Sequence, residues 1–302
     1  MRRRTSSSMR ARRLLAATVV AGTIAAAIVP AHASPSPMLI AHRGGAGLWP
    51  ENTLTAFRSA QTLFENAGVP GWLELDTQLT ADGVLVVIHD ATLDRTTNCS
   101  GNVVGHTAVE VTACDADPGP AFEPVPTLAQ VLTEGAAAGW RLVIETKNIP
   151  GEAGFVVGCT ALADGLRSAV AAAGFPADRL IVQSFWPLCL DRLESTAPEI
   201  PTLLLTSSST INALLGLASP VPLGFLLSVN GAFATLRGYE YSAPDQDTID
   251  LIGPVVTVVH LLGRKVVVWT VDDPARMASL AAIGVDGIIS DRPDLLVATF
   301  PA

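Results

Sequence analysis

Short runs of β-branched and other apolar residues alternate with Ala/Leu-rich stretches after residue 33, and this alternation constrains the fold more than any other feature. The runs expected to form strands are 38–42, 72–78, 84–89, 141–146, 180–185, 201–206, 224–229, 266–271 and 287–290. The stretches expected to form helices are 53–67, 127–138, 154–173, 187–196, 245–262 and 273–283. Runs such as Leu142-Val143-Ile144 are apolar on successive residues, as is typical of strands buried on both faces. Strands that alternate with helices in one long domain indicate a parallel sheet.

The sheet can be open or closed, and the end of its first strand favours the closed form. An open sheet of this class normally has a Gly-rich phosphate loop after the first strand, whereas His42-Arg43-Gly44-Gly45 is no nucleotide-binding fingerprint. About 250 residues is also the usual size of a closed α/β barrel. We therefore predict an α/β fold, a single-domain (β/α)8 barrel of the TIM type.

Two features interrupt the regular alternation. The strand-like runs outnumber by one the eight strands that such a barrel needs. The stretch from Leu79 to Val84 is also too short for the helical crossover that joins parallel strands. We therefore expect an irregular link between the second and third strands, and a long loop at about 90–126.

The first 33 residues have the three parts of a secretory signal peptide. Six arginines precede an apolar run at 14–29, and Ala31-His32-Ala33 is an A-x-A cleavage pattern. The alternative is a membrane anchor, but the run is shorter than the ~20 residues that a spanning helix needs. We predict cleavage near Ala33, a mature catalytic domain at 34–302, secretion to the extracellular space, and no stable membrane insertion afterwards.

The charge of the chain argues against nucleic-acid partners. The full sequence has a formal net charge of −9, with 19 basic and 28 acidic residues. Removal of the six N-terminal arginines leaves 13 basic residues and a net charge of −15. An acidic protein without a basic stripe is a poor partner for nucleic acid.

The four cysteines would meet an oxidising environment after export. Four cysteines allow three pairings, one of which joins the first cysteine to the second and the third to the fourth. They lack the C-x-x-C or His/Cys spacing of a zinc site, so we expect structural disulfides among Cys99, Cys114, Cys159 and Cys189.

Ionisable residues stand at the ends of the first four consecutive strands, where catalytic residues of such barrels usually lie. The spacing of two in Glu74-Leu75-Asp76, and again in Glu145-Thr146-Lys147, places both ionisable side chains on one face of a strand. If the strands are neighbours, their ends converge on one pocket. The residues expected there are His42, Arg43, Glu74, Asp76, His89, Glu145 and Lys147.

The charges of this pocket indicate its chemistry. Three carboxylates in a partly dry site repel one another unless a cation lies among them, and oxygen ligands suit Ca²⁺ or Mg²⁺ better than zinc. With a divalent ion, Arg43 and Lys147 bring the net charge to about +1, which suits an anionic phosphate. The two histidines can act as general acid and general base. These groups together favour phosphoryl transfer.

The sequence resembles the glycerophosphodiester phosphodiesterases over about residues 38–296. The resemblance rests on several motifs considered jointly. The matching segments are Ala41-His42-Arg43-Gly44, Pro50-Glu51-Asn52-Thr53-Leu54, Glu74-Leu75-Asp76-Thr77-Gln78-Leu79-Thr80-Ala81-Asp82-Gly83, His89-Asp90, Leu93-Asp94-Arg95-Thr96-Thr97, Glu145-Thr146-Lys147, Ser184-Phe185, Val268-Trp269-Thr270-Val271-Asp272 and Gly284-Val285-Asp286-Gly287-Ile288-Ile289-Ser290-Asp291-Arg292-Pro293.

The resemblance implies hydrolysis of a small glycerophosphodiester to an alcohol and sn-glycerol 3-phosphate. It implies one divalent metal ion, Ca²⁺ or Mg²⁺, held by Glu74, Asp76 and Glu145. It also implies an acid/base pair, His42 and His89, and the phosphate contacts Arg43 and Lys147. No protein partner is implied.

Further polar residues have two readings each. Asn52 either contacts phosphate or a metal-bound water, or caps the helix that begins near Thr53. Trp269 either stacks on the glycerol or the leaving group or packs in the barrel, and Gln183 has the same two readings. Asp291 is expected to stabilise a turn.

Three alternatives compete with this function. Sphingomyelinase D-like phospholipases share the two histidines and three carboxylates, and form cyclic phosphates from lysophospholipids. No basic amphipathic helix marks this chain for a lipid surface. A glycosidase also uses paired carboxylates, but would leave His42, His89 and Lys147 without a role. A non-catalytic phosphodiester-binding barrel would be expected to have lost some of these residues.

Overall fold

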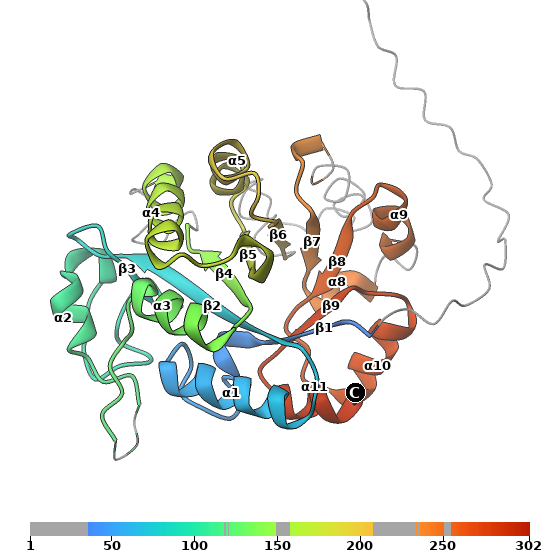
Figure 1. Cartoon of the computed structure of the whole chain (residues 1–302), viewed down its shortest axis with the longest axis horizontal. Coiled ribbons are helices and arrows are strands. Elements are labelled where there is room, and N and C mark those ends of the chain that lie inside the picture. Colours follow the sequence, from blue (N-terminus) through green and yellow to red (C-terminus); the bar gives the residue numbers. More distant parts are fainter. Residues whose placement is uncertain are drawn as a thin grey trace, which may run out of the picture. The chain divides into compact units, whose positions relative to one another are not determined.

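Eight parallel strands close into a ring within the described part of the chain (Figure 1). The computed structural model describes residues 36–302 apart from 118, 120, 149–157, 208–233, 235 and 251–254. Each strand pairs with the next, and the last pairs with the first. In order around the ring, the strands are β1 (Met38–Ala41), β2 (Gly71–Leu79), β4 (Leu142–Thr146), β5 (Leu180–Ser184), β6 (Thr202–Thr206), β7 (Tyr241–Pro244), β8 (Lys265–Val268) and β9 (Gly287–Ser290). The predicted TIM-type barrel is confirmed.

The strands form because their side chains are buried on both faces of the sheet. All five residues of β4 are buried, for example, as are all five of β5. One face fills the interior of the ring, and the other packs on the surrounding helices. The interior cluster comprises Ile40, Val143, Ile181, Leu203, Leu205, Tyr241, Ala243, Val267 and Ile289.

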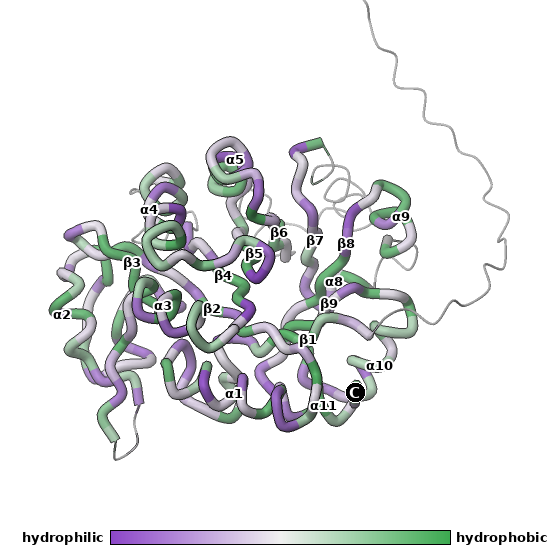
Figure 2. The backbone as a smooth tube through the Cα atoms, viewed as in Figure 1, coloured by the Kyte–Doolittle hydropathy of each residue, from purple (hydrophilic) through white to green (hydrophobic). Residues whose placement is uncertain are grey.

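Helices cover the outside of the ring, and Figure 2 shows hydrophobic and hydrophilic residues alternating along coils such as α4 and α11. Thr53 caps the first helix, since its Oγ1 accepts a hydrogen bond from Ala56 N. Thr127 closes a reciprocal capping box with Gln130. The helices are α1 (Leu54–Asn66), α3 (Leu128–Ala138), α4 (Gly158–Ala173), α5 (Pro187–Thr196), α8 (Gln246–Asp250), α9 (Val255–Leu261), α10 (Pro274–Ala282) and α11 (Pro293–Thr299).

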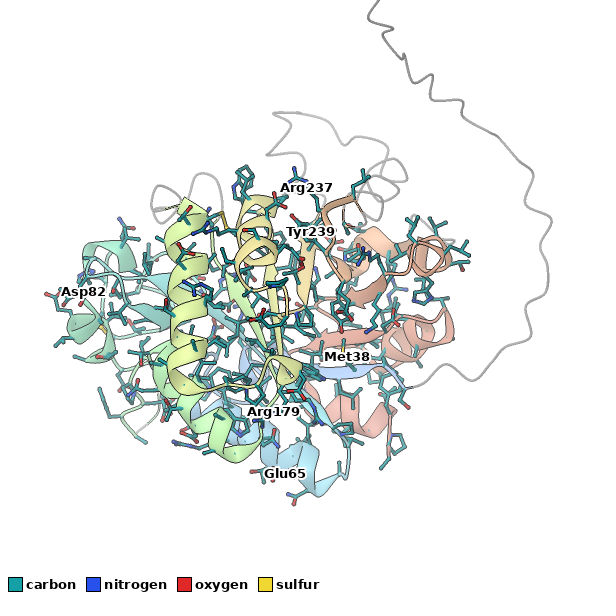
Figure 3. The ribbon with its side chains drawn as sticks, turned by 45° about the horizontal axis from the view of Figure 1, so that its top comes forward. Met38, Glu65, Asp82, Arg179, Arg237 and Tyr239 are labelled. Atoms are coloured by element: carbon teal, nitrogen blue, oxygen red, sulfur yellow. A yellow bond between two sulfur atoms is a disulfide. The ribbon has the colours of Figure 1, made fainter. Side chains whose placement is uncertain are left out.

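The third strand-like run, at 84–89, explains the irregular link. β3 (Leu85–Val87) pairs antiparallel with β2, so a short turn joins them and no crossover is needed. Figure 3 labels Asp82 in this turn, and Met38 and Arg179 near the N-terminal ends of β1 and β5. β3 therefore lies outside the ring as an addition to one of its strands.

The predicted long loop follows β3 and has a small core of its own. It contains α2 (Ala108–Thr112), and its apolar side chains pack on residues such as Val86 and Ile88. A disulfide joins Cys99 and Cys114 within it. We call residues 90–126 the β3–α3 loop.

The second disulfide joins Cys159 of α4 to Cys189 of α5. Asn148, two residues after the end of β4, donates its amide N–H to Cys159 Sγ at 3.0 Å. The expected structural disulfides are therefore present, and each joins two cysteines with no other cysteine between them in the sequence.

The seventh strand differs from its prediction. The run 224–229 lies outside the described residues, and the strand between β6 and β8 is β7, at Tyr241–Pro244. A four-residue segment ending in proline has little strand signal of its own; it is buried because its neighbours in the ring surround it. The helix expected at 245–262 is described as α8 and α9, with 251–254 outside the described residues. Figure 3 labels Arg237 and Tyr239, just before β7, and both contact Asp191 of α5.

None of the described helices combines the length and the apolar character of a membrane-spanning segment.

Candidate active site

A row of polar side chains crosses three neighbouring strands at their carboxyl ends. In the parallel register, Asp76 of β2 is the partner of Glu145 of β4, and Glu145 is the partner of Gln183 of β5. Glu74 lies two residues before Asp76, so it shares the same face of β2. The fold therefore brings together the three carboxylates that the sequence placed at strand ends.

These carboxylates form a tight, buried cluster. Glu74, Asp76 and Glu145 each offer an oxygen within 4.8 Å of the others, and all three side chains are buried. Burial, and then the negative charge of Asp76, raise the pKa of Glu74 to about 8. Burial also raises the pKa of Glu145 to about 7, although the Lys147 ammonium opposes this rise.

Asp76 has the opposite shift. Burial alone would raise the pKa of Asp76, but the positive charges of Lys147, His89 and Arg43 hold it well below its usual range. Lys147 Nζ lies 3.1 Å from Asp76 Oδ1 and 2.9 Å from Glu145 Oε1. Its pKa is raised by these two carboxylates, against the effect of its own burial.

The donor set fits a hard divalent cation. Gln183 Oε1 is buried without a hydrogen bond among the described residues, and Asp76 Oδ1 and Glu145 Oε1 are buried beside the Lys147 ammonium. Buried acceptors normally have a partner, and carboxylate and amide oxygens are ligands typical of Ca²⁺ and Mg²⁺. Gln183 Nε2 donates a hydrogen bond to Glu74 Oε1 at 2.8 Å.

His42 follows β1 and is oriented by an aspartate from the far end of the chain. Its Nδ1 lies 2.6 Å from Asp291 Oδ1, directly after β9. Burial alone would lower the pKa of His42, but the hydrogen bond to Asp291 and the charge of Glu74 raise it overall. An ionised aspartate only accepts, so Nδ1 carries a proton and Nε2, which lies 4.0 Å from Glu74 Oε2, faces the cluster.

His89 is held in a similar way by its neighbour in sequence. Its Nδ1 lies 2.6 Å from Asp90 Oδ1, and its carbonyl accepts from Gln78 Nε2 at 3.1 Å. Burial lowers the pKa of His89, and the charge of Asp76 only partly offsets this. The two histidines therefore have pKa values shifted in opposite directions.

Arg43 lies directly after His42, in a left-handed backbone conformation with φ of 51°. That conformation turns its N–H toward the cluster, where it donates to Glu74 Oε2 at 2.8 Å. Its Nη1 donates to Glu51 Oε1 at 3.0 Å, and its Nε lies 3.4 Å from Asp76 Oδ2.

A cavity of about 260 Å³ opens over these groups. Trp269 forms part of its wall, edge-on to Phe185 with ring centroids 5.4 Å apart, and donates its indole N–H to Ala243 O at 2.8 Å. The lining residues are His42, Arg43, His89, Glu145, Lys147, Gln183, Phe185, Leu205, Ser207, Trp269, Thr270 and Ile289.

The structure excludes one of the two readings of Asn52, that of a helix cap. Thr53, and not Asn52, caps α1. The Asn52 amide donates to Asp76 Oδ2 at 2.9 Å, and its Oδ1 accepts from Asp76 N at 3.1 Å. Asn52 therefore supports a cluster carboxylate, and its direct contact with substrate stays a prediction.

Asp291 is the site residue that sequence reasoning assigned differently. We expected it to stabilise a turn, and the structure places it on His42. The pairing of β9 with β1 makes this contact, and that closure was part of the predicted fold. An acidic residue directly after the last strand was therefore the signal that could have identified it.

Comparison with known proteins identifies the family. A model of the glycerophosphoryl diester phosphodiesterase family matches residues 42–295. The chain belongs to this family. It is therefore a hydrolase with glycerophosphodiester phosphodiesterase activity.

Individual relatives agree with this assignment. A glycerophosphodiester phosphodiesterase of Caldanaerobacter subterraneus subsp. tengcongensis is 33% identical over 264 residues, covering 86% of this chain and 96% of the relative. The crystal structure of the glycerophosphodiester phosphodiesterase of Agrobacterium tumefaciens C58 has a TM-score of 0.67 at 25% identity, covering 87% of this chain and 99% of that one. A phosphodiesterase of Oleispira antarctica, solved with its product sn-glycerol-3-phosphate, has the same fold, with a TM-score of 0.70 at 23% identity and coverage of 87% and 96%.

Proposed function

We propose that this phosphodiesterase hydrolyses glycerophosphodiesters to an alcohol and sn-glycerol 3-phosphate, with a divalent metal ion and two histidines. The observation that carries the proposal is the buried Glu74–Asp76–Glu145 cluster between two imidazoles, each oriented by an aspartate. The Oleispira antarctica relative was solved with this same product.

Glu74, Asp76 and Glu145 would hold the ion, Ca²⁺ or Mg²⁺, with Gln183 beside them. When bound, such an ion polarises phosphoryl oxygens and offsets the negative charge that develops on them. The three buried carboxylates, of which Lys147 contacts two, and the unpaired Gln183 Oε1 support this assignment.

The side chains around the cluster have distinct roles in the proposal. Arg43 and Lys147 bind the phosphate oxygens, and Trp269 packs on the glycerol or the alcohol portion. His42 and His89 exchange protons with the attacking water and the leaving alkoxide, each through Nε2. Asp291 and Asp90 keep the other nitrogen of each ring protonated.

Histidine variants test this assignment. We expect His42→Ala and His89→Ala each to lower kcat for glycerophosphocholine by ~10²–10⁴-fold, because proton transfer is lost, with metal affinity retained. His260→Ala is the matched control, since His260 contacts Asp286 on another part of the barrel. Near-normal turnover in either site variant would contradict the proposed roles. Release of a cyclic phosphate by the wild-type enzyme would contradict direct hydrolysis and indicate attack by a hydroxyl of the substrate itself.

We also propose that the enzyme is exported and that residues 1–33 are its signal peptide. The Cys99–Cys114 and Cys159–Cys189 bonds support an oxidising destination. In an export-competent bacterial host, the secreted protein should begin at Ser34 by N-terminal sequencing. A retained N-terminus in the cell-associated protein would contradict this.

A further inference from the structure

Arg95, in the β3–α3 loop, forms bidentate hydrogen bonds with two carboxylates. Its Nε and Nη2 donate to Asp90 Oδ2 and Oδ1 at 2.6 and 2.9 Å. Its Nη1 and Nη2 donate to Glu51 Oε2 and Oε1 at 2.9 and 2.8 Å. The planar guanidinium thus holds one carboxylate along each of two edges, which a lysine ammonium cannot do.

Each of these carboxylates also contacts a residue of the active site. Asp90 Oδ1 lies 2.6 Å from His89 Nδ1, and Glu51 Oε1 accepts from Arg43 Nη1 at 3.0 Å. Both of these shared oxygens are bound by the same Arg95 nitrogen, Nη2. Arg95 Nη2 therefore bridges the carboxylate that contacts His89 and the carboxylate that contacts Arg43.

Strand β2 holds the backbone of both residues, because Arg43 N donates to Glu74 Oε2 and Gln78 Nε2 donates to the His89 carbonyl. Arg43 follows β1, a strand of the ring, whereas His89 follows β3, which lies outside the ring and pairs with β2 alone among the described strands. Beyond this attachment to β2, the relative position of the imidazole and the guanidinium depends on the contacts of His89 Nδ1 with Asp90 and of Arg43 Nη1 with Glu51.

We propose that Arg95 is a positioning residue that ties His89 to Arg43, so that one side chain fixes both the acid/base imidazole and the phosphate-binding guanidinium. This inference rests on the proposed function for the roles of His89 and Arg43. It assigns to the β3–α3 loop a part in catalysis that needs no contact with substrate.

The ionic contacts and the loop packing both stabilise the link that Arg95 makes between Asp90 and Glu51. The hydrogen bonds from Arg95 lower the pKa of Asp90 to about 2. The pKa of Glu51 is also lowered by Arg95 and Arg43, although burial opposes this. On the loop side, Leu93 is buried in the small core, and the Cys99–Cys114 bond closes the loop just after Arg95.

Two variants of Arg95 and one matched control test the tie. We expect Arg95→Ala to lower kcat by about 10²-fold, the cost typical of a misplaced catalytic group, with metal affinity unchanged. Arg95→Lys should recover little of this loss. Arg58→Ala is the control, because Arg58 makes an equally bidentate exposed pair with Glu134, between α1 and α3, and should leave kcat unchanged.

Chemical rescue separates positioning from general damage. The Arg95 side chain is 47% exposed, so added guanidinium ion can reach the space that Arg95→Ala leaves. At non-denaturing concentration it should restore part of the lost kcat in Arg95→Ala and none in His89→Ala. Normal turnover in Arg95→Ala, or an equal loss in Arg58→Ala, would overturn the inference.

A measurement without substrate keeps this inference distinct from the proposed function. In ¹⁵N spectra of the imidazole rings, Arg95→Ala should shift the His89 signals and leave those of His260 in place. Unchanged His89 signals would overturn the tie even if the enzyme is active. Shifted signals in a protein that releases no glycerol 3-phosphate would support the tie and contradict the proposed function.

Discussion

Asp76 and Glu145 are direct partners across β2 and β4, and Lys147 Nζ lies 3.1 Å from Asp76 Oδ1 and 2.9 Å from Glu145 Oε1. The lysine thus neutralises part of the charge that the two carboxylates and Glu74 create. A divalent ion at the cluster would share these oxygens with Lys147. This relationship leads to the first two predictions.

Asp76→Asn should weaken binding of Ca²⁺ and Mg²⁺ by more than about 100-fold, since even residues that only orient metal ligands typically contribute 10–100-fold. Isothermal titration calorimetry measures this directly. Asp164→Asn is the control, because Asp164 pairs with Arg192 on the outside of the barrel. Equal affinity in the Asp76 and Asp164 variants would remove Asp76 from the metal site.

Lys147→Gln should bind divalent ions more tightly than the wild type and turn over more slowly. The substitution removes an ammonium that competes with the metal ion for Asp76 and Glu145, and it also removes a predicted phosphate contact. Loss of one partner of a buried ion pair typically costs ~3–5 kcal/mol, so the metal-free variant should melt at a lower temperature and recover on addition of metal. Weaker metal binding in this variant would contradict the competition.

The metal-free protein should become less stable as the pH rises from about 5 to 8. Glu74 and Glu145 have folded pKa values of about 8 and 7, above their unfolded value of about 4.3. The folded state therefore binds more protons in this window, and its stability falls as they are released. The raised pKa of His42 acts in the same direction, and the lowered pKa of His89 opposes it near neutrality.

Thermal unfolding in EDTA at several pH values tests this. Each unit by which a folded pKa exceeds the unfolded pKa changes the free energy of unfolding by about 1.4 kcal/mol. For a chain of this size, that corresponds to ~2–4 °C of Tm. Glu74→Gln should flatten the profile, because it removes the group with the higher value. A metal-free Tm that rises between pH 5 and 8 would contradict the raised values.

Asp291→Asn should lower kcat by ~10–100-fold, as is typical when the partner that orients a functional side chain is lost. An asparagine amide can donate to His42 Nδ1, which favours the wrong tautomer. Asp294→Asn is the matched control, since Asp294 pairs with Arg292 at the start of α11. Steady-state kinetics on glycerophosphocholine distinguishes the two variants.

The local patterns of the sequence predicted much of the site. The spacing of Glu74 and Asp76 places both on one face of β2, and Glu145 and Lys147 have the same spacing across the end of β4. The direct pairing of Asp76 with Glu145 could not be predicted, because the register between strands far apart in sequence depends on the packing of the whole ring.

The remaining differences have the same origin. β7 is short and ends in proline, so the ring and not its own composition makes it a strand. Asn52 precedes a helix and so resembles a cap, but its left-handed backbone, with φ of 61°, accompanies a side chain hydrogen-bonded to Asp76. The contact of Asp291 with His42 spans 249 residues, and it follows from the pairing of β9 with β1 rather than from the sequence around either residue.

The measurement that tests the account most directly is release of glycerol 3-phosphate from glycerophosphocholine by the purified protein. It should be made on untreated enzyme, after EDTA, and after addition of Ca²⁺ or Mg²⁺. The account predicts release that EDTA abolishes and one of the two ions restores. Release that persists undiminished after EDTA, or no release under any of these conditions, would contradict it.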